Sequence, residues 1–88
     1  MMEVTYDGDC CLEVRGHAGT APRGQDLICA GATVLVLTLG EQAEEKEIRR
    51  GYARITGGNR EVYIAIAAGF QLLAKNFPEG VHFKCIQG

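Results

Sequence analysis

The sequence predicts an α+β fold, a two-layer sandwich in which an antiparallel or mixed sheet packs against two helices. Short segments with alternating apolar residues stand at both ends and in the middle of the chain. Two longer apolar segments, 27–42 and 60–76, lie between them. Gly, Pro, Asn and Asp separate the segments, which indicates the order β-β-α-β-β-α-β.

The first two segments predict a β-hairpin. Residues 2–6 alternate as a strand does, and Asp7-Gly8-Asp9 supplies turn chemistry. Residues 10–15 form the returning strand, which Gly16 ends, and a loop over 17–25 rich in Gly, Ala and Pro follows.

Asp26 is a suitable N-cap for the first helix. From Leu27 to about Gln42 the chain is apolar nearly all round, so we expect this helix to be buried on most sides or partly buried against a second copy of the protein.

Two short strands, 44–49 and 52–56, are expected next, joined by a turn at Arg50-Gly51. Apolar residues spaced by three and four predict a helix from about Arg60 to Asn76, ended by Pro78 and Gly80. Residues 81–86 alternate again and form the last strand.

The length, net charge and composition of the chain argue against several classes of function. The 88 residues form a single domain, 1–88, and the net charge of −2 with no basic stripe argues against nucleic-acid binding. The longest apolar run is shorter than the roughly 20 residues that a membrane span needs, and it is no signal peptide. We therefore expect a cytoplasmic protein with no membrane partner. The four cysteines should be reduced there, and without a C-x-x-C pair we expect no metal site.

Cys29 is the candidate reactive residue. With Asp26 as N-cap it would be the third helical residue, where free N–H groups and the helix dipole favour a thiolate. His17 ends the hairpin, and the loop after it is long enough to bring the imidazole back to Cys29 as a nucleophile–base dyad. The alternative is that Cys29 is a small buried hydrophobe and His17 an ordinary loop residue.

Neighbouring residues have candidate roles as well. Asp26 can orient the imidazole as well as cap the helix. Thr33 lies one turn after Cys29, and its hydroxyl can bond either a substrate carbonyl or its own helix backbone. The N–H groups of Cys29 and Ala30 are candidates for an oxyanion hole. Cys10, Cys11 and Cys85 have weaker cases, since none stands at a helix start.

Gly16-His17-Ala18, a short loop and then Asp26-Leu27-Ile28-Cys29-Ala30 resemble the signature of the ribosomal-processing cysteine proteases, called Prp. The resemblance implies a cytoplasmic cysteine endopeptidase that removes the N-terminal extension of one large-subunit ribosomal protein, number twenty-seven. It implies a homodimer that uses no metal or cofactor. By position, Cys29 would be the nucleophile, His17 the base, Asp26 a supporting residue and Gly16 the hinge of the loop. The family commonly has serine where Thr33 stands.

Three alternatives stay open. Related proteins in phages and prophages would process a capsid or scaffold protein instead. A non-enzymatic, homodimeric peptide-binding module would use the apolar helix as its interface and an edge strand for a partner peptide. A redox thiol sensor would need Cys10 or Cys11 to approach Cys29.

Overall fold

The computed structural model of the chain describes residues 1–16 and 25–86, with the backbone alone at residues 25 and 26. Its element order confirms the predicted β-β-α-β-β-α-β arrangement. The elements are β1 (Met2–Tyr6), β2 (Cys11–Arg15), α1 (Gln25–Gln42), β3 (Glu45–Arg49), β4 (Tyr52–Thr56), α2 (Arg60–Asn76) and β5 (Val81–Cys85).

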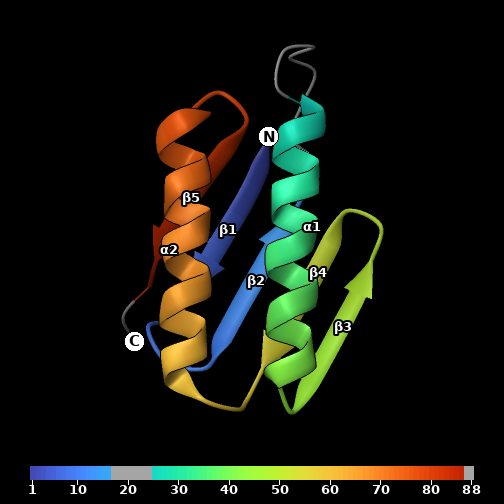
Figure 1. Ribbon diagram of the computed structural model, residues 1–88, viewed down its shortest axis with the longest axis vertical. Helices are drawn as coiled ribbons and strands as arrows, with labels where there is room; N and C mark the ends of the chain where they lie inside the picture. The colour runs from blue at the N-terminus through green and yellow to red at the C-terminus, as the bar shows by residue number, and fades with distance from the viewer. Residues whose placement is uncertain (17–24, 87–88) are drawn as a thin grey trace.

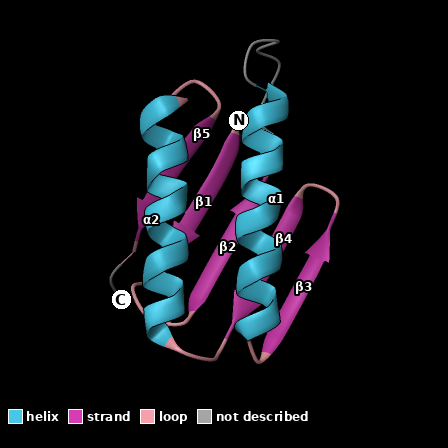
Figure 2. Ribbon diagram, in the orientation of Figure 1, coloured by secondary structure: helices cyan, strands magenta, loops and turns pink. Residues whose placement is uncertain are grey.

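The strands form one mixed sheet in the order β3-β4-β2-β1-β5. The pairs β1–β2, β2–β4 and β3–β4 are antiparallel, whereas β1 and β5 are parallel. Figure 1 shows α1 and α2 side by side across one face of this sheet. Figure 2 shows the same two layers, and no helix covers the other face of the sheet within the residues drawn as elements. The predicted two-layer α+β sandwich is therefore confirmed.

The core lies between the sheet and the helices. In β1, β2 and β4 the residues that alternate toward the helices are buried, as period-two patterning requires, whereas the edge strand β3 is exposed along its length. Buried residues on the two helices recur at spacings of three and four. The largest fully buried side chains are Tyr63, Phe70, Leu12, Leu39, Ile55, Val4 and Val81.

The predicted turn chemistry is present in the first hairpin. The Asp7 carboxylate accepts hydrogen bonds from the backbone N–H groups of Asp9 at 2.8 Å and Cys11 at 3.1 Å. Gly8 has a φ of 85°, in the left-handed region that glycine adopts without a steric cost. Together these contacts bring the two strands back alongside each other.

Helix α1 differs from the sequence-based expectation in two respects. It begins at Gln25, before the expected start. In the single chain it is also buried on one side and not on most sides, since Ile28, Ala32 and Val36 face the core whereas Leu27 and Val34 are each 63% exposed; the alternative, burial against a second copy, stays a prediction. An all-round apolar helix has no polar side to indicate its orientation, so the outward face could not be identified beforehand.

Within residues 1–16 and 25–86, no helix has the length and hydropathy that crossing a bilayer demands.

Candidate active site

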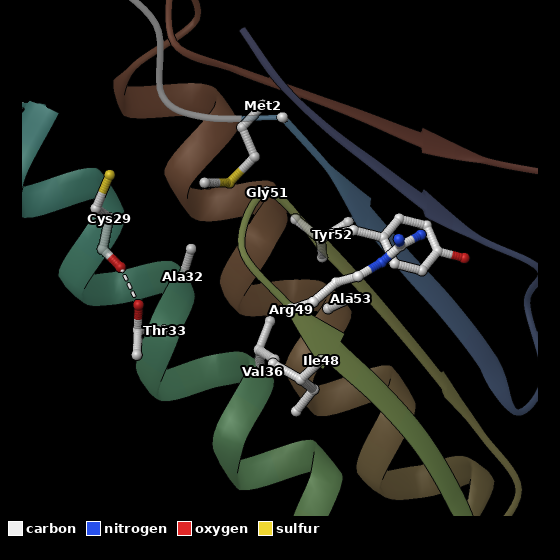
Figure 3. Close-up of a pocket in the computed structure, with 12 residues that line it drawn as sticks. Met2, Cys29, Ala32, Thr33, Val36, Ile48, Arg49, Gly51, Tyr52 and Ala53 are labelled. Carbon is white, nitrogen blue, oxygen red and sulfur yellow. Dashed lines mark hydrogen bonds between the residues drawn. The ribbon is translucent and has the colours of Figure 1, made fainter.

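A cavity of about 210 Å³ lies between α1 and the adjoining ends of β2, β3 and β4. Figure 3 shows its labelled lining residues, with Cys29, Ala32, Thr33 and Val36 on the helix and Ile48 across from them on β3. Gly16 at the end of β2 and Gly51 in the β3–β4 turn complete its rim. The cavity therefore brings together segments that lie far apart in the sequence.

Cys29 lines this cavity and is half-buried. Because α1 begins at Gln25, Asp26 is the second helical residue and not the N-cap, and Cys29 is the fifth and not the third.

The start of α1 also bears on the predicted oxyanion hole. In an α-helix each N–H bonds the carbonyl four residues before it. In a helix that starts at Gln25, the Gln25 and Asp26 carbonyls are the helical partners of the Cys29 and Ala30 N–H groups, and the oxyanion hole stays a prediction. The Ala30 side chain lies elsewhere too, in an outer groove between α1 and α2 that Leu27 and Val34 also line.

Thr33 lies on the cavity side of α1, one turn after Cys29. Its hydroxyl donates a hydrogen bond to the Cys29 carbonyl oxygen at 2.7 Å. The sequence left two roles open for this hydroxyl, a bond to a substrate carbonyl or a bond to its own helix backbone, and the structure has the second. The hydroxyl oxygen keeps lone pairs that can accept a further hydrogen bond.

Gly16 is held by one hydrogen bond and has a backbone conformation that requires glycine. Its N–H donates to the Gly51 carbonyl oxygen at 2.8 Å. Its φ is +83°, and a Cβ added there would lie 2.5 Å from the Met1 carbonyl oxygen. Only glycine fits both the backbone angle and the close approach. Gly16 is thus a fixed end of β2 beside the cavity, and His17, the next residue, lies outside the described residues.

Sequence reasoning missed several residues of the cavity. Met2 and Ala53 form part of its apolar floor, Ile48 part of its wall, and Gly51 part of its rim. No local motif marks them, because the sheet brings them to Cys29 by non-local pairing.

A network around Tyr52 lies on the sheet face away from the helices. The Tyr52 hydroxyl donates to Glu13 Oε2 at 2.9 Å, and Arg15 Nε donates to Glu13 Oε1 at 2.8 Å. The guanidinium carbons of Arg15 and Arg49 lie 5.4 Å and 4.6 Å from the Tyr52 ring centroid. The hydrogen bond from Arg15 lowers the pKa of Glu13, and the hydrogen bond to Glu13 raises the pKa of Tyr52.

The other three cysteines lie away from the cavity. Cys10 packs against the core and donates a weak hydrogen bond to the Gly58 carbonyl oxygen at 3.5 Å; burial raises the pKa of its thiol. Cys11 lies 3.8 Å from Arg54 Nη2, and Cys85 is exposed. In the described parts of the chain, no three His, Cys, Asp or Glu side chains gather as a metal site.

A family model described as cysteine protease Prp matches residues 2–81. A search of curated proteins found no match.

Solved structures share the fold at low sequence identity. SMU.848 from Streptococcus mutans superposes with a TM-score of 0.79 at 24% identity, covering 100% of this chain and 96% of that chain. The essential ribosomal processing protease Prp from S. aureus, with a covalently linked product peptide, gives 0.73 at 17% identity and 96% coverage of both chains. The same protease with a substrate peptide gives 0.70 at 16%, covering 93% and 94%.

Proposed function

The chain belongs to the family of the cysteine protease Prp, and from that premise we propose that it removes the N-terminal extension of large-subunit ribosomal protein twenty-seven, with Cys29 as nucleophile and His17 as base. The S. aureus relative is a ribosomal processing protease whose structures hold a product or a substrate peptide, which supports this substrate class. The reaction would take place in the cytoplasm, where ribosomes are assembled.

The observation that carries the proposal is that Cys29 and Gly16 line one cavity. Successive Cα atoms are about 3.8 Å apart, so His17 begins beside a residue of the cavity rim. Gly16 itself is held to the β3–β4 turn by its hydrogen bond to the Gly51 carbonyl oxygen. We propose that the chain after Gly16 brings the imidazole to the Cys29 thiol.

The chemistry follows from this pair. His17 takes the thiol proton, and the sulfur attacks a backbone carbonyl carbon of the substrate. As the C–N bond of the peptide breaks, the imidazolium returns its proton to the leaving amine and a thioester remains on Cys29. Water, deprotonated by the same imidazole, then hydrolyses the thioester and restores the thiol.

The cavity itself indicates what lies beside the cut bond. Met2, Ala32 and Ala53 are buried at its floor, and Val36 and Ile48 stand on its walls. Such a lining stabilises an apolar side chain by removing it from water. We therefore expect an apolar residue of the substrate to occupy it, with the scissile carbonyl near Cys29. We assign Asp26 to supporting the imidazole, and the Thr33 oxygen to accepting a hydrogen bond from the substrate backbone.

We also propose that the protein is a homodimer through the outer face of the helices. Leu27, Val34, Leu37 and Leu72 are 54–63% exposed, and an apolar groove of about 450 Å³ separates α1 from α2 on this side. Residues 27–40 carry no charge. Val34→Glu should shift the protein to a monomer in sedimentation equilibrium. Ile86→Glu, an exposed apolar site on the β5 side, is the control, and equal dissociation by both variants would argue against this face.

The substrate assignment has a direct test. The protein is mixed with a synthetic peptide spanning the ribosomal extension, and the products are weighed by mass spectrometry. Two fragments are expected from the wild type and none from Cys29→Ala. If the ribosomal peptide stays intact and a phage head-protein peptide is cut, the substrate is the one that the phage alternative names. Cutting by Cys29→Ala would remove the nucleophile assignment.

A further inference from the structure

The cavity beside Cys29 owes its depth to one position on strand β4. Ala53 and Ile55 both point toward the helices, because alternate residues of a strand share a face. Ile55 is fully buried and fills its place in the core, whereas Ala53 lies at the floor of the cavity. The same face of one strand thus changes from filled core to open space within two residues.

The neighbours of Ala53 in the sheet have larger side chains. Ala53 pairs with Val14 on β2 and with Ile48 on β3, and both of these are branched. Across the cavity, α1 contributes Ala32, and Figure 3 shows Ala32 on the helix side with Ala53 on the sheet side. A single methyl group on each side therefore leaves space that longer side chains would fill.

This space is large enough to hold a whole apolar side chain. An apolar cavity of about 150 Å³ holds a benzene molecule. The cavity beside Cys29 has a volume of about 210 Å³ and a buried apolar floor. A phenyl or isobutyl group would fit there and would be stabilised by its removal from water.

We propose that Ala53 is a specificity-determining residue, which admits a large apolar side chain of the substrate beside the bond that Cys29 attacks; this deepens the proposed function and rests on it. Ala53 contacts the substrate side chain and takes no part in the transfer of the proton or the acyl group. A longer side chain at this position would exclude large substrate residues and leave small ones acceptable.

The chain offers a matched control for this position. Ala53 and Ala67 are each 5% exposed and both belong to the buried core. Ala67 lies on α2, whereas the described residues that line the cavity come from α1 and the sheet with its turns. Ala53→Leu and Ala67→Leu add the same isopropyl group, but only the first places it in the cavity. Ala53→Val adds less volume and takes the place of Ala53→Leu if that variant does not fold.

The first readout is the reaction of the thiols with N-ethylmaleimide and N-benzylmaleimide, followed on separate peptides by mass spectrometry. Cys85 is exposed and lies away from the cavity, so the ratio of its two rates gives the intrinsic preference of the reagents. At Cys29 the benzyl reagent should gain roughly tenfold over that ratio, because its ring enters the cavity. Ala53→Leu should return the Cys29 ratio to the Cys85 value, and Ala67→Leu should leave it raised.

The second readout is cleavage of a peptide library in which the residues around the cut bond are varied one at a time. At the position that enters the cavity, leucine or phenylalanine should give a kcat/KM roughly tenfold above that of alanine. Ala53→Leu should lose this preference and still cut the alanine peptides at nearly the wild-type rate. Ala67→Leu should keep the wild-type order of preference.

The two experiments distinguish failure of this inference from failure of the proposed function. If Cys29 reacts in the Cys85 ratio, or with neither reagent, the assignment of Ala53 is overturned. It is also overturned if Ala53→Leu keeps the wild-type preference, or slows every peptide by the same factor as Ala67→Leu, and the protease assignment then stands. A library left wholly uncut by the folded wild type would overturn the proposed function and, with it, the substrate role of Ala53, even if the Cys29 ratio is raised.

Discussion

Gly16→Ala is the substitution that most directly links the fold to the site. A non-glycine residue at a φ of +83° costs about 1–2 kcal/mol. The new Cβ would lie 2.5 Å from the Met1 carbonyl oxygen, so backbone must move, which adds about 1–3 kcal/mol. Alanine restricts the unfolded chain and offsets about 0.4–1 kcal/mol of this. The net loss in the free energy of unfolding is therefore about 1–5 kcal/mol.

The assay is thermal and urea unfolding followed by circular dichroism. A domain of this size loses about 4–8 °C of Tm for each kcal/mol, so the expected drop is readily measured. Peptide cleavage should fall as well, because Gly16 leads directly to His17. Gly31→Ala is the matched control, since its Cβ would lie 3.3 Å from the end of the Leu73 side chain and alanine favours the helix by up to about 1 kcal/mol. A Gly16→Ala protein as stable as Gly31→Ala would refute the reasoning.

Further predictions concern protonation and the core. The pKa of Glu13 lies below its ordinary value of 4.5, so its stabilising contribution is present above pH 4.5 and is lost as the pH falls through the lower folded value. The difference in unfolding free energy between the wild type and Glu13→Gln should therefore shrink below pH 4.5, and a constant gap from pH 7 to 3 would contradict this. Burial raises the pKa of Tyr63 from 10.0 to about 12, so its contribution is full below pH 10 and is lost as the pH rises toward 12. Absorbance titration of the wild type against Tyr63→Phe should show no Tyr63 phenolate at pH 10.5 while the protein is folded. Phe70 has no exposed surface. Phe70→Ala should therefore lower the free energy of unfolding in urea by about 3–5 kcal/mol, and a loss under about 1 kcal/mol would contradict this.

The elements were predictable because their signals are local. The period of Val62, Ile66 and Phe70 predicted the helix Arg60–Asn76 with the bounds that the structure has. Turn residues at Asp7 and Gly51 likewise separated the strands correctly. Where the hydrophobic period of a segment and the turn residues at its ends predict the same element, tertiary contacts agree with that prediction.

The site was less predictable because its geometry is not local. The sequence left the sheet as antiparallel or mixed, since nothing in 2–6 or 81–86 indicates that β1 and β5 pair in parallel. Asp26 was a reasonable cap by residue type, yet Gln25 already has helical geometry. Met2 and Ile48 become neighbours of Cys29 only through the pairing of the sheet strands. Ala30 faces the outer groove, which the sequence did not indicate because an all-apolar helix has no polar side to show which residues face outward.

The most direct test of the account is a comparison of peptide cleavage by five variants under identical conditions. Cys10→Ala, Cys11→Ala and Cys85→Ala remove thiols that lie away from the cavity, whereas Cys29→Ala and His17→Ala remove the proposed dyad. The account predicts wild-type cutting from the first three and a loss of at least about 10³-fold from the last two, as expected when members of a catalytic group are removed. Cutting that survives in Cys29→Ala, or that disappears in any of the first three while the protein stays folded, would contradict it.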